Sequence, residues 1–142
     1  MKNDEGFISS ILFEAENEYN NKNYKEALNI ISLLLTKNYK TLSLRAKIYY
    51  NQSEYYKSLK DCEECINLLL NDKNNKNKIE IYQLSVLNHI KMFDLENAKE
   101  KLKKCQKIDK NNPKNNELLY LIQQEEKKMK KIQKNINNIQ FI

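Results

Sequence analysis

The chain has 142 residues and a formal net charge of +6, and 40% of its residues are hydrophobic. This length and composition suit one domain with a single core. The sequence holds one glycine and one proline. Glycine supplies the positive φ of tight turns and lets backbone approach phosphate closely, so its scarcity excludes phosphate-binding loops and most folds built from β-hairpins. Because glycine and proline are the worst residues inside helices, the same scarcity predicts an all-helical protein.

The excess of positive over negative charge lies in the second half of the chain. Residues 1–72 carry 9 basic and 11 acidic side chains, whereas residues 73–142 carry 16 and 8. Arg45 is the only arginine in the sequence. Since arginine is preferred for bidentate contacts to bases and phosphates, we expect no specific nucleic-acid binding. A surplus of lysine and asparagine is typical of codon bias, which would account for the net positive charge without a function. The alternative is attachment to an anionic surface, such as nucleic acid or a membrane, through the lysines.

Cysteine usage and hydropathy indicate the compartment. Cys62, Cys65 and Cys105 do not form an even disulfide framework and are typical of a reducing environment. Residues 1–10 lack the apolar stretch of a secretory signal peptide, and the longest apolar runs are too short to span a membrane. The sequence therefore predicts a cytoplasmic protein with no membrane span.

Three segments of the chain share one spacing of small, bulky and small residues. A small or short residue is followed nine positions later by tyrosine or leucine, and three positions after that by alanine or serine. The three sets are Ala15, Tyr24 and Ala27; Ala46, Tyr55 and Ser58; and Val86, Leu95 and Ala98. Small residues allow two antiparallel helices to approach closely, and the bulky residue fills the turn between them. Such hairpins cannot cover their own apolar faces, so we expect them to stack on one another.

These segments resemble the tetratricopeptide repeat (TPR) family over residues 8–112. The resemblance rests on the small residue of the first helix, the tyrosine of the turn, the alanine that opens the second helix and the ending Asp109–Pro113. It implies an all-α solenoid of three helix hairpins followed by a long C-terminal capping helix, an arrangement similar to that of co-chaperones. The expected segments are an N-terminal tail (1–7), repeats one (8–38), two (39–72) and three (79–112), an Asn/Lys-rich loop (73–78) and the capping helix (115–139).

The distance between successive repeats is not constant. The second set of residues follows the first by 31 positions, and the third follows the second by 40. The longer distance indicates an insertion, which the polar stretch 71–78 accounts for. A polar stretch without apolar anchors is expected to be a mobile loop.

No arrangement of residues in the sequence indicates catalysis. Acid–base or nucleophilic chemistry needs a base beside an acid or nucleophile in a cleft. The only histidine, His89, falls on a core-facing helix position, and no catalytic or phosphate-binding motif is present. We therefore predict that the protein is not an enzyme and needs no cofactor.

Cys62 and Cys65 form a CxxC pair, which in other proteins binds metal or carries redox chemistry. A zinc site needs a second pair of ligands, and a thioredoxin-type site needs a strand–helix–strand context. Both cysteines fall on core-facing positions of the predicted second helix, and Cys105 takes the place of Cys65 in the third repeat. We interpret all three as small apolar packing residues and predict no metal site, with a metal or redox role as the alternative.

TPR domains are protein-interaction scaffolds, and the first helices of their hairpins line a concave groove. The resemblance implies that this groove takes a peptide or a helix of another protein. The expected groove residues are Leu12, Glu16, Tyr19, Leu44, Lys47, Tyr50, Leu84 and Leu87.

Co-chaperones of the TPR family hold the acidic tail of a chaperone with a clamp of lysine, asparagine and arginine side chains. The matching positions here are Leu12, Glu16, Leu44, Glu80 and Leu84, and none carries the required donor. Glu16 and Glu80 would repel a peptide carboxylate. We therefore expect the groove to reject EEVD-type tails and to hold an apolar strip of a partner instead, within a chaperone-associated complex or elsewhere.

The C-terminal helix carries apolar residues beyond the length that a cap needs. We expect its second half to protrude with an apolar edge at Met129, Ile132, Ile136 and Ile139. The leading function is thus a non-enzymatic adaptor that binds another protein in its groove. The alternative is a structural subunit that forms a homo-oligomer by coiled-coil pairing of this edge.

Overall fold

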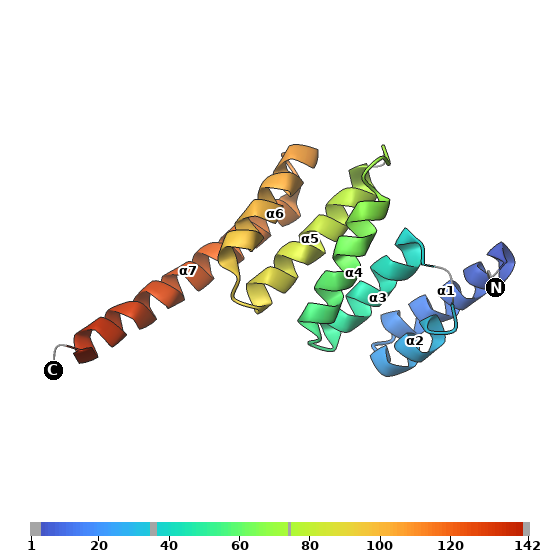
Figure 1. Ribbon diagram of the computed structural model, residues 1–142, viewed down its shortest axis with the longest axis horizontal. Coiled ribbons are helices and arrows are strands. Elements are labelled where there is room, and N and C mark those ends of the chain that lie inside the picture. Colours follow the sequence, from blue (N-terminus) through green and yellow to red (C-terminus); the bar gives the residue numbers. More distant parts are fainter. Residues whose placement is uncertain (1–3, 35–36, 74, 141–142) are drawn as a thin grey trace.

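The computed structural model describes residues 4–34, 37–73 and 75–140, and within these ranges the chain forms seven helices and no strand (Figure 1). The helices are α1 (Glu5–Asn20), α2 (Tyr24–Ile31), α3 (Tyr39–Asn51), α4 (Tyr55–Leu68), α5 (Asn75–Lys91), α6 (Leu95–Ile108) and α7 (Pro113–Gln140). The predicted all-α class is therefore confirmed, with neighbouring helices packed against each other.

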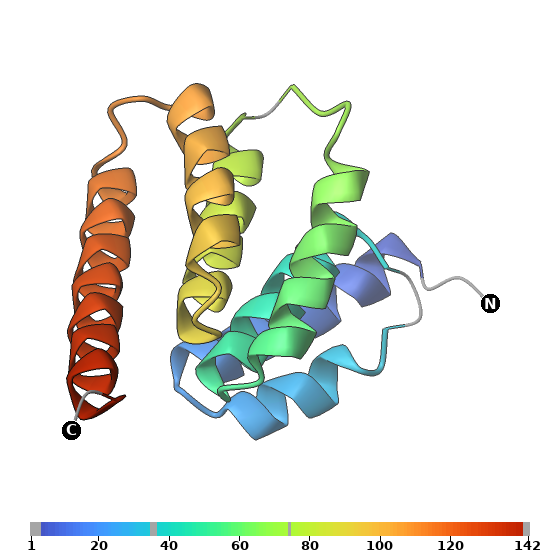
Figure 2. The same ribbon diagram turned by 60° about the vertical axis from the view of Figure 1, so that its left-hand side comes forward.

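The helices pack in the order of the chain (Figure 2). α1 pairs with α2, α3 with α4 and α5 with α6, and α7 lies against both α5 and α6. The backbones also come close between α1 and α3, α3 and α5, and α5 and α7, whereas α2, α4 and α6 approach only odd-numbered helices. A stack that is tighter on one side is concave on that side, so the molecule curves toward its odd-numbered helices.

Each helix pair needs the next odd-numbered helix to complete its core. The cluster around Ala15 and Ala27 is closed by Leu44 and Ile48 of α3. The clusters of the second and third pairs are closed in the same way, by Ile81 and Leu84 of α5 and by Leu118 and Ile122 of α7. Burial of these side chains, worth about 1.5–3 kcal/mol for each large aliphatic residue, therefore depends on the neighbouring unit.

The small side chains predicted to lie between paired helices are fully buried. Ala15, Ala27, Ala46, Ser58 and Ala98 are all 0% exposed, as is Val86, which takes the first position in the third set. The bulky turn residues Tyr24, Tyr55 and Leu95 each open the second helix of a pair. The Tyr24 ring packs against Tyr19 with centroids 5.7 Å apart, and the ring of Tyr55 packs against Tyr50 at 5.6 Å.

The three hairpin turns have the same backbone conformation. Lys22, Ser53 and Phe93 adopt left-handed φ angles of 64°, 62° and 58°. In each turn the next residue donates its backbone N–H to the carbonyl five positions earlier, from Asn23 to Glu18, from Glu54 to Tyr49 and from Asp94 to His89, at 2.8–2.9 Å. This backbone conformation is the Schellman motif, which ends many helices and usually has glycine at its left-handed position. Its recurrence at distances of 31 and 40 residues reproduces the predicted repeat spacing.

Several predicted boundaries differ from the structure. α5 begins at Asn75, so residues 75–78 of the predicted loop 73–78 are helical, and Asn74 lies outside the described residues. The cause is cooperative extension of a helix that is already anchored by Ile79 and Ile81. α1 begins at Glu5, inside the predicted tail 1–7, because the side chain of Asp4 accepts the N–H of Phe7 at 2.7 Å and caps the helix. Residues 1–3 of that tail lie outside the described residues.

The C-terminal helix is longer than the predicted range 115–139. It begins at Pro113, since proline at the first helical position lacks only an N–H that the first turn leaves unpaired. Its last described residue, Gln140, is also helical.

Polar contacts inside the stack join helices far apart in sequence. Arg45 of α3 donates from Nε and Nη2 to the two oxygens of the buried Asp61 of α4 at 2.7 and 2.8 Å. This pairing raises the pKa of Arg45 above its usual value. Asn88 of α5 donates to Ser58 Oγ at 2.8 Å, and Ser58 donates to the carbonyl of Ala46 at 2.7 Å. These bonds fix α3, α4 and α5 relative to one another.

Replacing Ala27 tests the close approach of α1 and α2. Ala27→Leu should overpack this contact and lower the free energy of unfolding by about 1–3 kcal/mol in urea titrations. Lys25→Leu places the same side chain at an exposed position of α2 and should change it by less than about 0.5 kcal/mol. Equal effects of the two substitutions would contradict the packing described here.

Glycine at a left-handed turn residue should stabilise the protein. Ser53→Gly removes the cost of a left-handed L-residue and should raise the free energy of unfolding by about 1 kcal/mol. Ser53→Ala keeps that cost and should bring no gain in the same thermal or urea denaturation. A gain from alanine equal to that from glycine would show that the turn is not strained.

Candidate protein-interaction groove

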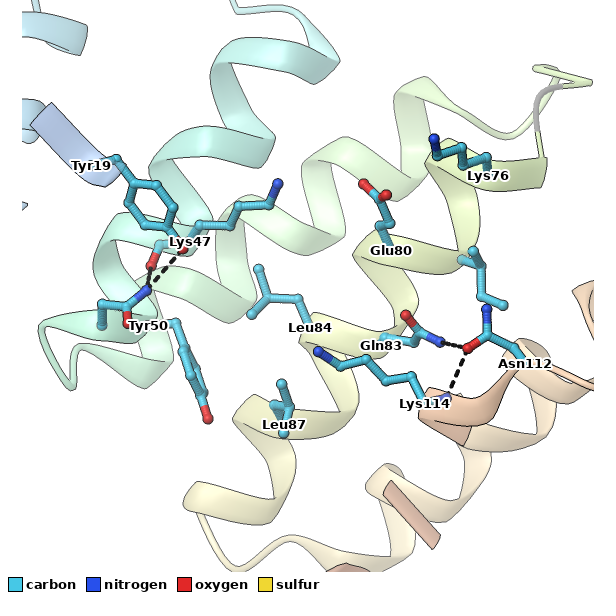
Figure 3. Close-up of a pocket in the computed structure, with 12 residues that line it drawn as sticks. Tyr19, Lys47, Tyr50, Lys76, Glu80, Gln83, Leu84, Leu87, Asn112 and Lys114 are labelled. Atoms are coloured by element: carbon cyan, nitrogen blue, oxygen red, sulfur yellow. Dashed lines mark hydrogen bonds between the residues drawn. The ribbon is translucent and has the colours of Figure 1, made fainter. Parts of the chain in front are cut away.

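Two adjoining cavities open on the concave side of the molecule, and Figure 3 shows the first of them. The first, of about 640 Å³, is lined by α1, α3, α5 and the segment from Asn112 to Lys114. The second, of about 400 Å³, is lined by α1, α3, α5 and the C-terminal part of α4. Tyr19, Lys47 and Glu80 line both cavities. We call the two together the groove.

Seven of the eight residues predicted from the sequence line the groove. Glu16, Tyr19 and Leu44 line the second cavity, and Tyr19 also reaches the first. The first cavity contains Lys47, Tyr50, Leu84 and Leu87, of which Lys47 also lines the second. Leu12 lies outside the groove. It is one helical turn before Glu16, and its side chain packs in the core cluster of α1, α2 and α3, where it is only 9% exposed. Partner binding by these residues remains a prediction.

The floor of the first cavity is apolar. Leu84 and Leu87 lie on neighbouring positions of one face of α5, and Tyr50 stands beside them on α3 (Figure 3). Asn51 donates from Nδ2 to Tyr19 Oη at 3.2 Å and to the carbonyl of Lys47 at 2.8 Å, which fixes the tyrosine at the wall. The floor thus offers apolar contact area between polar walls, the composition that is common in binding sites.

Lysines stand at the walls of this floor. Lys47 of α3 and Lys114 of α7 extend toward the space above Leu84 from either side (Figure 3). Neither lysine takes part in an ion pair with another described residue. Glu80 of α5 lines both cavities, and Glu16 of α1 lines only the second. The second cavity therefore holds as many acidic as basic residues, whereas lysines outnumber acidic residues in the first.

A buried network of amides positions the basic wall. Gln83 of α5 donates from Nε2 to Asn112 Oδ1 at 3.2 Å and to Asn115 Oδ1 at 3.1 Å. Asn115, which is 1% exposed, donates to the carbonyl of Asp109 at 2.9 Å, and Asn112 Oδ1 also accepts the backbone N–H of Lys114 at 3.0 Å. Because a buried amide without partners is costly, this network holds the start of α7 in place.

Sequence reasoning missed Lys114, Gln83 and Asn112 as groove residues. Lys114 lines the groove because α7 packs against α5, and the repeat template ends before α7 begins. Gln83 and Asn112 lie within the template, and their hydrogen bond to each other places them at this wall. Pro113, which marks the start of α7, was the only local signal in the sequence that pointed to this wall.

The residues considered for catalysis or metal binding are buried. His89 is 6% exposed and lies 3.4 Å from Asp94 through its Nδ1, and burial lowers the pKa of this histidine. Cys62, Cys65 and Cys105 are unpaired and buried, and burial raises the pKa of their thiols to about 12, 11 and 12. Among the described residues, no group of three or more His, Cys, Asp or Glu side chains could hold a metal ion.

The thiols should resist alkylation in the folded protein. At pH 8 iodoacetamide should modify none of the three cysteines at an appreciable rate, because burial shields them and their raised pKa values keep them protonated. The same treatment in denaturant should modify all three, as read by intact-mass spectrometry. Rapid labelling of Cys62 or Cys65 under native conditions would show that they are reactive and not packing residues.

Across the described ranges, no helix is both long enough and apolar enough to cross a lipid bilayer. A scan against models of known protein families finds no match for this chain, and a search among curated proteins finds none either.

Proposed function

We propose that this protein is a cytoplasmic, non-catalytic adaptor that binds a segment of another protein in the groove, and that its helix pairs are tetratricopeptide repeats. The observation that carries the proposal is a concave groove with an apolar floor, formed by successive odd-numbered helices. The repeated turn conformation supports the assignment to repeats, as do core clusters that each require the next helix pair.

The chemistry of the groove suits an internal segment of a partner better than its C-terminus. The clamp positions that line the groove hold Glu16, Leu44, Glu80 and Leu84, which offer no donor to a terminal carboxylate. The floor of Leu84 and Leu87 favours apolar side chains, and the lysines beside it favour acidic residues next to them. The proposed ligand is therefore an extended or helical segment with apolar residues flanked by aspartate or glutamate.

Attachment to nucleic acid or to an anionic membrane is less well supported. Lys99 pairs with Glu126 at 2.6 Å and Lys128 pairs with Glu125 at 3.2 Å. Lys101 and Lys104 lie over the ring of Tyr82, at 6.0 and 5.8 Å from its centroid. Part of the basic surface thus serves contacts within the protein, and a salt titration with duplex DNA would separate this alternative from the adaptor.

Selection from a random peptide library tests the proposed ligand. Peptides selected on the native protein should carry apolar residues flanked by acidic ones, and their binding should be measured by fluorescence anisotropy. Joint substitution of Lys47→Glu and Lys114→Glu should weaken binding at least about tenfold, since it turns two attractive contacts into repulsive ones.

The matched control is the pair Lys60→Glu and Lys103→Glu, which makes the same charge change at exposed positions of α4 and α6. This control should retain the affinity of the native protein for the selected peptides. Equal loss in both double variants, or selection of peptides that require a free EEVD end, would contradict the proposal.

A further inference from the structure

We propose that two copies of this chain associate through the C-terminal half of α7, with the two helices antiparallel. This inference does not depend on the groove. It begins from the spacing of one face of α7, which alternates between four and three residues, the pattern of a coiled-coil seam. The residues of this seam are Leu118, Ile122, Glu125, Met129, Ile132, Ile136 and Ile139.

The protein itself covers only the first part of the seam. Leu118 and Ile122 are 1% and 0% exposed and belong to the core cluster of α5 and α6. Lys99, in the first turns of α6, pairs with Glu126, and α7 continues past this point without a neighbouring helix (Figure 1). Met129, Ile132, Ile136 and Ile139 are 46%, 59%, 43% and 69% exposed, so this association edge, predicted from the sequence, is uncovered.

The residues beside the uncovered edge do not oppose a second copy. Gln133, Asn135 and Gln140, which flank the seam in the helical repeat, are uncharged amides. The lysines of this stretch stand mostly on the outer side of the helix, at positions 127, 130, 131 and 134. Lys128 also flanks the edge, where it pairs with Glu125 at 3.2 Å. An apolar edge whose other flanks are neutral can meet an identical edge without placing like charges face to face.

The spacing of the edge is symmetric about position 134. Met129 and Ile139 lie five residues on either side of it, and Ile132 and Ile136 lie two residues on either side. In an antiparallel pair, Ile132 therefore meets Ile136 of the second copy, and Met129 meets Ile139. A surface that matches itself in this way about a two-fold axis is what a closed dimer requires, which favours a second copy of this chain as the occupant.

Charge selects the antiparallel arrangement over the parallel one. The lysines gather in the first half of the protruding stretch, whereas residues 135–140 are isoleucine, asparagine and glutamine. A parallel pair would place the two lysine clusters next to each other. An antiparallel pair places each cluster beside the uncharged residues 135–140 of the other helix, where no cation opposes it.

Sedimentation velocity over a range of protein concentrations tests the association. Four apolar side chains from each copy are far fewer than the ~20–30 residues a side of a standard interface, so dissociation should occur in the micromolar range or above. The mass should rise from the 17.0 kDa of one chain toward twice that value as the concentration increases. If the measured mass stays that of one chain at protein concentrations up to several hundred micromolar, the proposal is wrong.

Two double variants separate the edge from general effects of charge. Ile132→Asp with Ile136→Asp should remain monomeric at every concentration, whereas Lys134→Asp with Asn137→Asp, on the outer side of the same helix, should still dimerise. Because all four positions are exposed in one chain, circular dichroism of both variants at low concentration should match the native protein. Dimers of the first variant, or loss of dimers in the second, would contradict a contact through this edge.

Cross-linking distinguishes the two orientations. In a mixture of differently tagged proteins, the Ile132→Cys variant should form a disulfide with the Ile136→Cys variant much faster than either does with itself. Faster self-cross-linking of the Ile132→Cys variant would show parallel helices and overturn the proposed arrangement.

Discussion

A pair of short helices is too thin to bury its own apolar face, and the whole structure follows from this constraint. The core of each helix pair is finished by side chains of the next unit, down to Leu118 and Ile122 of α7. No pair is therefore expected to be stable by itself, and α7 is required because it covers the last exposed face. The polar contacts, such as Arg45 with Asp61, add orientation to this apolar packing.

The groove is a geometric consequence of the same packing. Fully buried small residues bring paired helices together, and direct contacts between successive odd-numbered helices make that side the tighter one. Side chains on this side that the core does not fully bury, such as Leu87 and Lys114, line a common cavity. Because this concave wall is already formed in the free protein, the proposed binding of a polypeptide would not require the wall to become ordered first.

Much of the fold could be predicted from residue spacing, because the three helix pairs have the same buried small residues and the same turn at equivalent positions. The burial of Ala15, Ala46 and Ala98 follows from such spacing. Contacts that depend on how separate helices pack could not be predicted. Asp61 pairs with Arg45 because α4 packs against α3. Lys114 lines the groove because α7 packs against α5. The left-handed turn residues could not be predicted either, because Lys22, Ser53 and Phe93 stand at positions where glycine is the usual signal.

We propose that a partner binds on the concave side, against the odd-numbered helices. Amide chemical-shift mapping of the isotope-labelled protein during titration with a selected peptide would locate the bound segment. The largest shifts should follow the groove from Glu16 through Lys47 and Leu84 to Lys114, with α2 and the exposed side of α4 little changed. Shifts concentrated on α2, α4 and α6 would contradict this proposal.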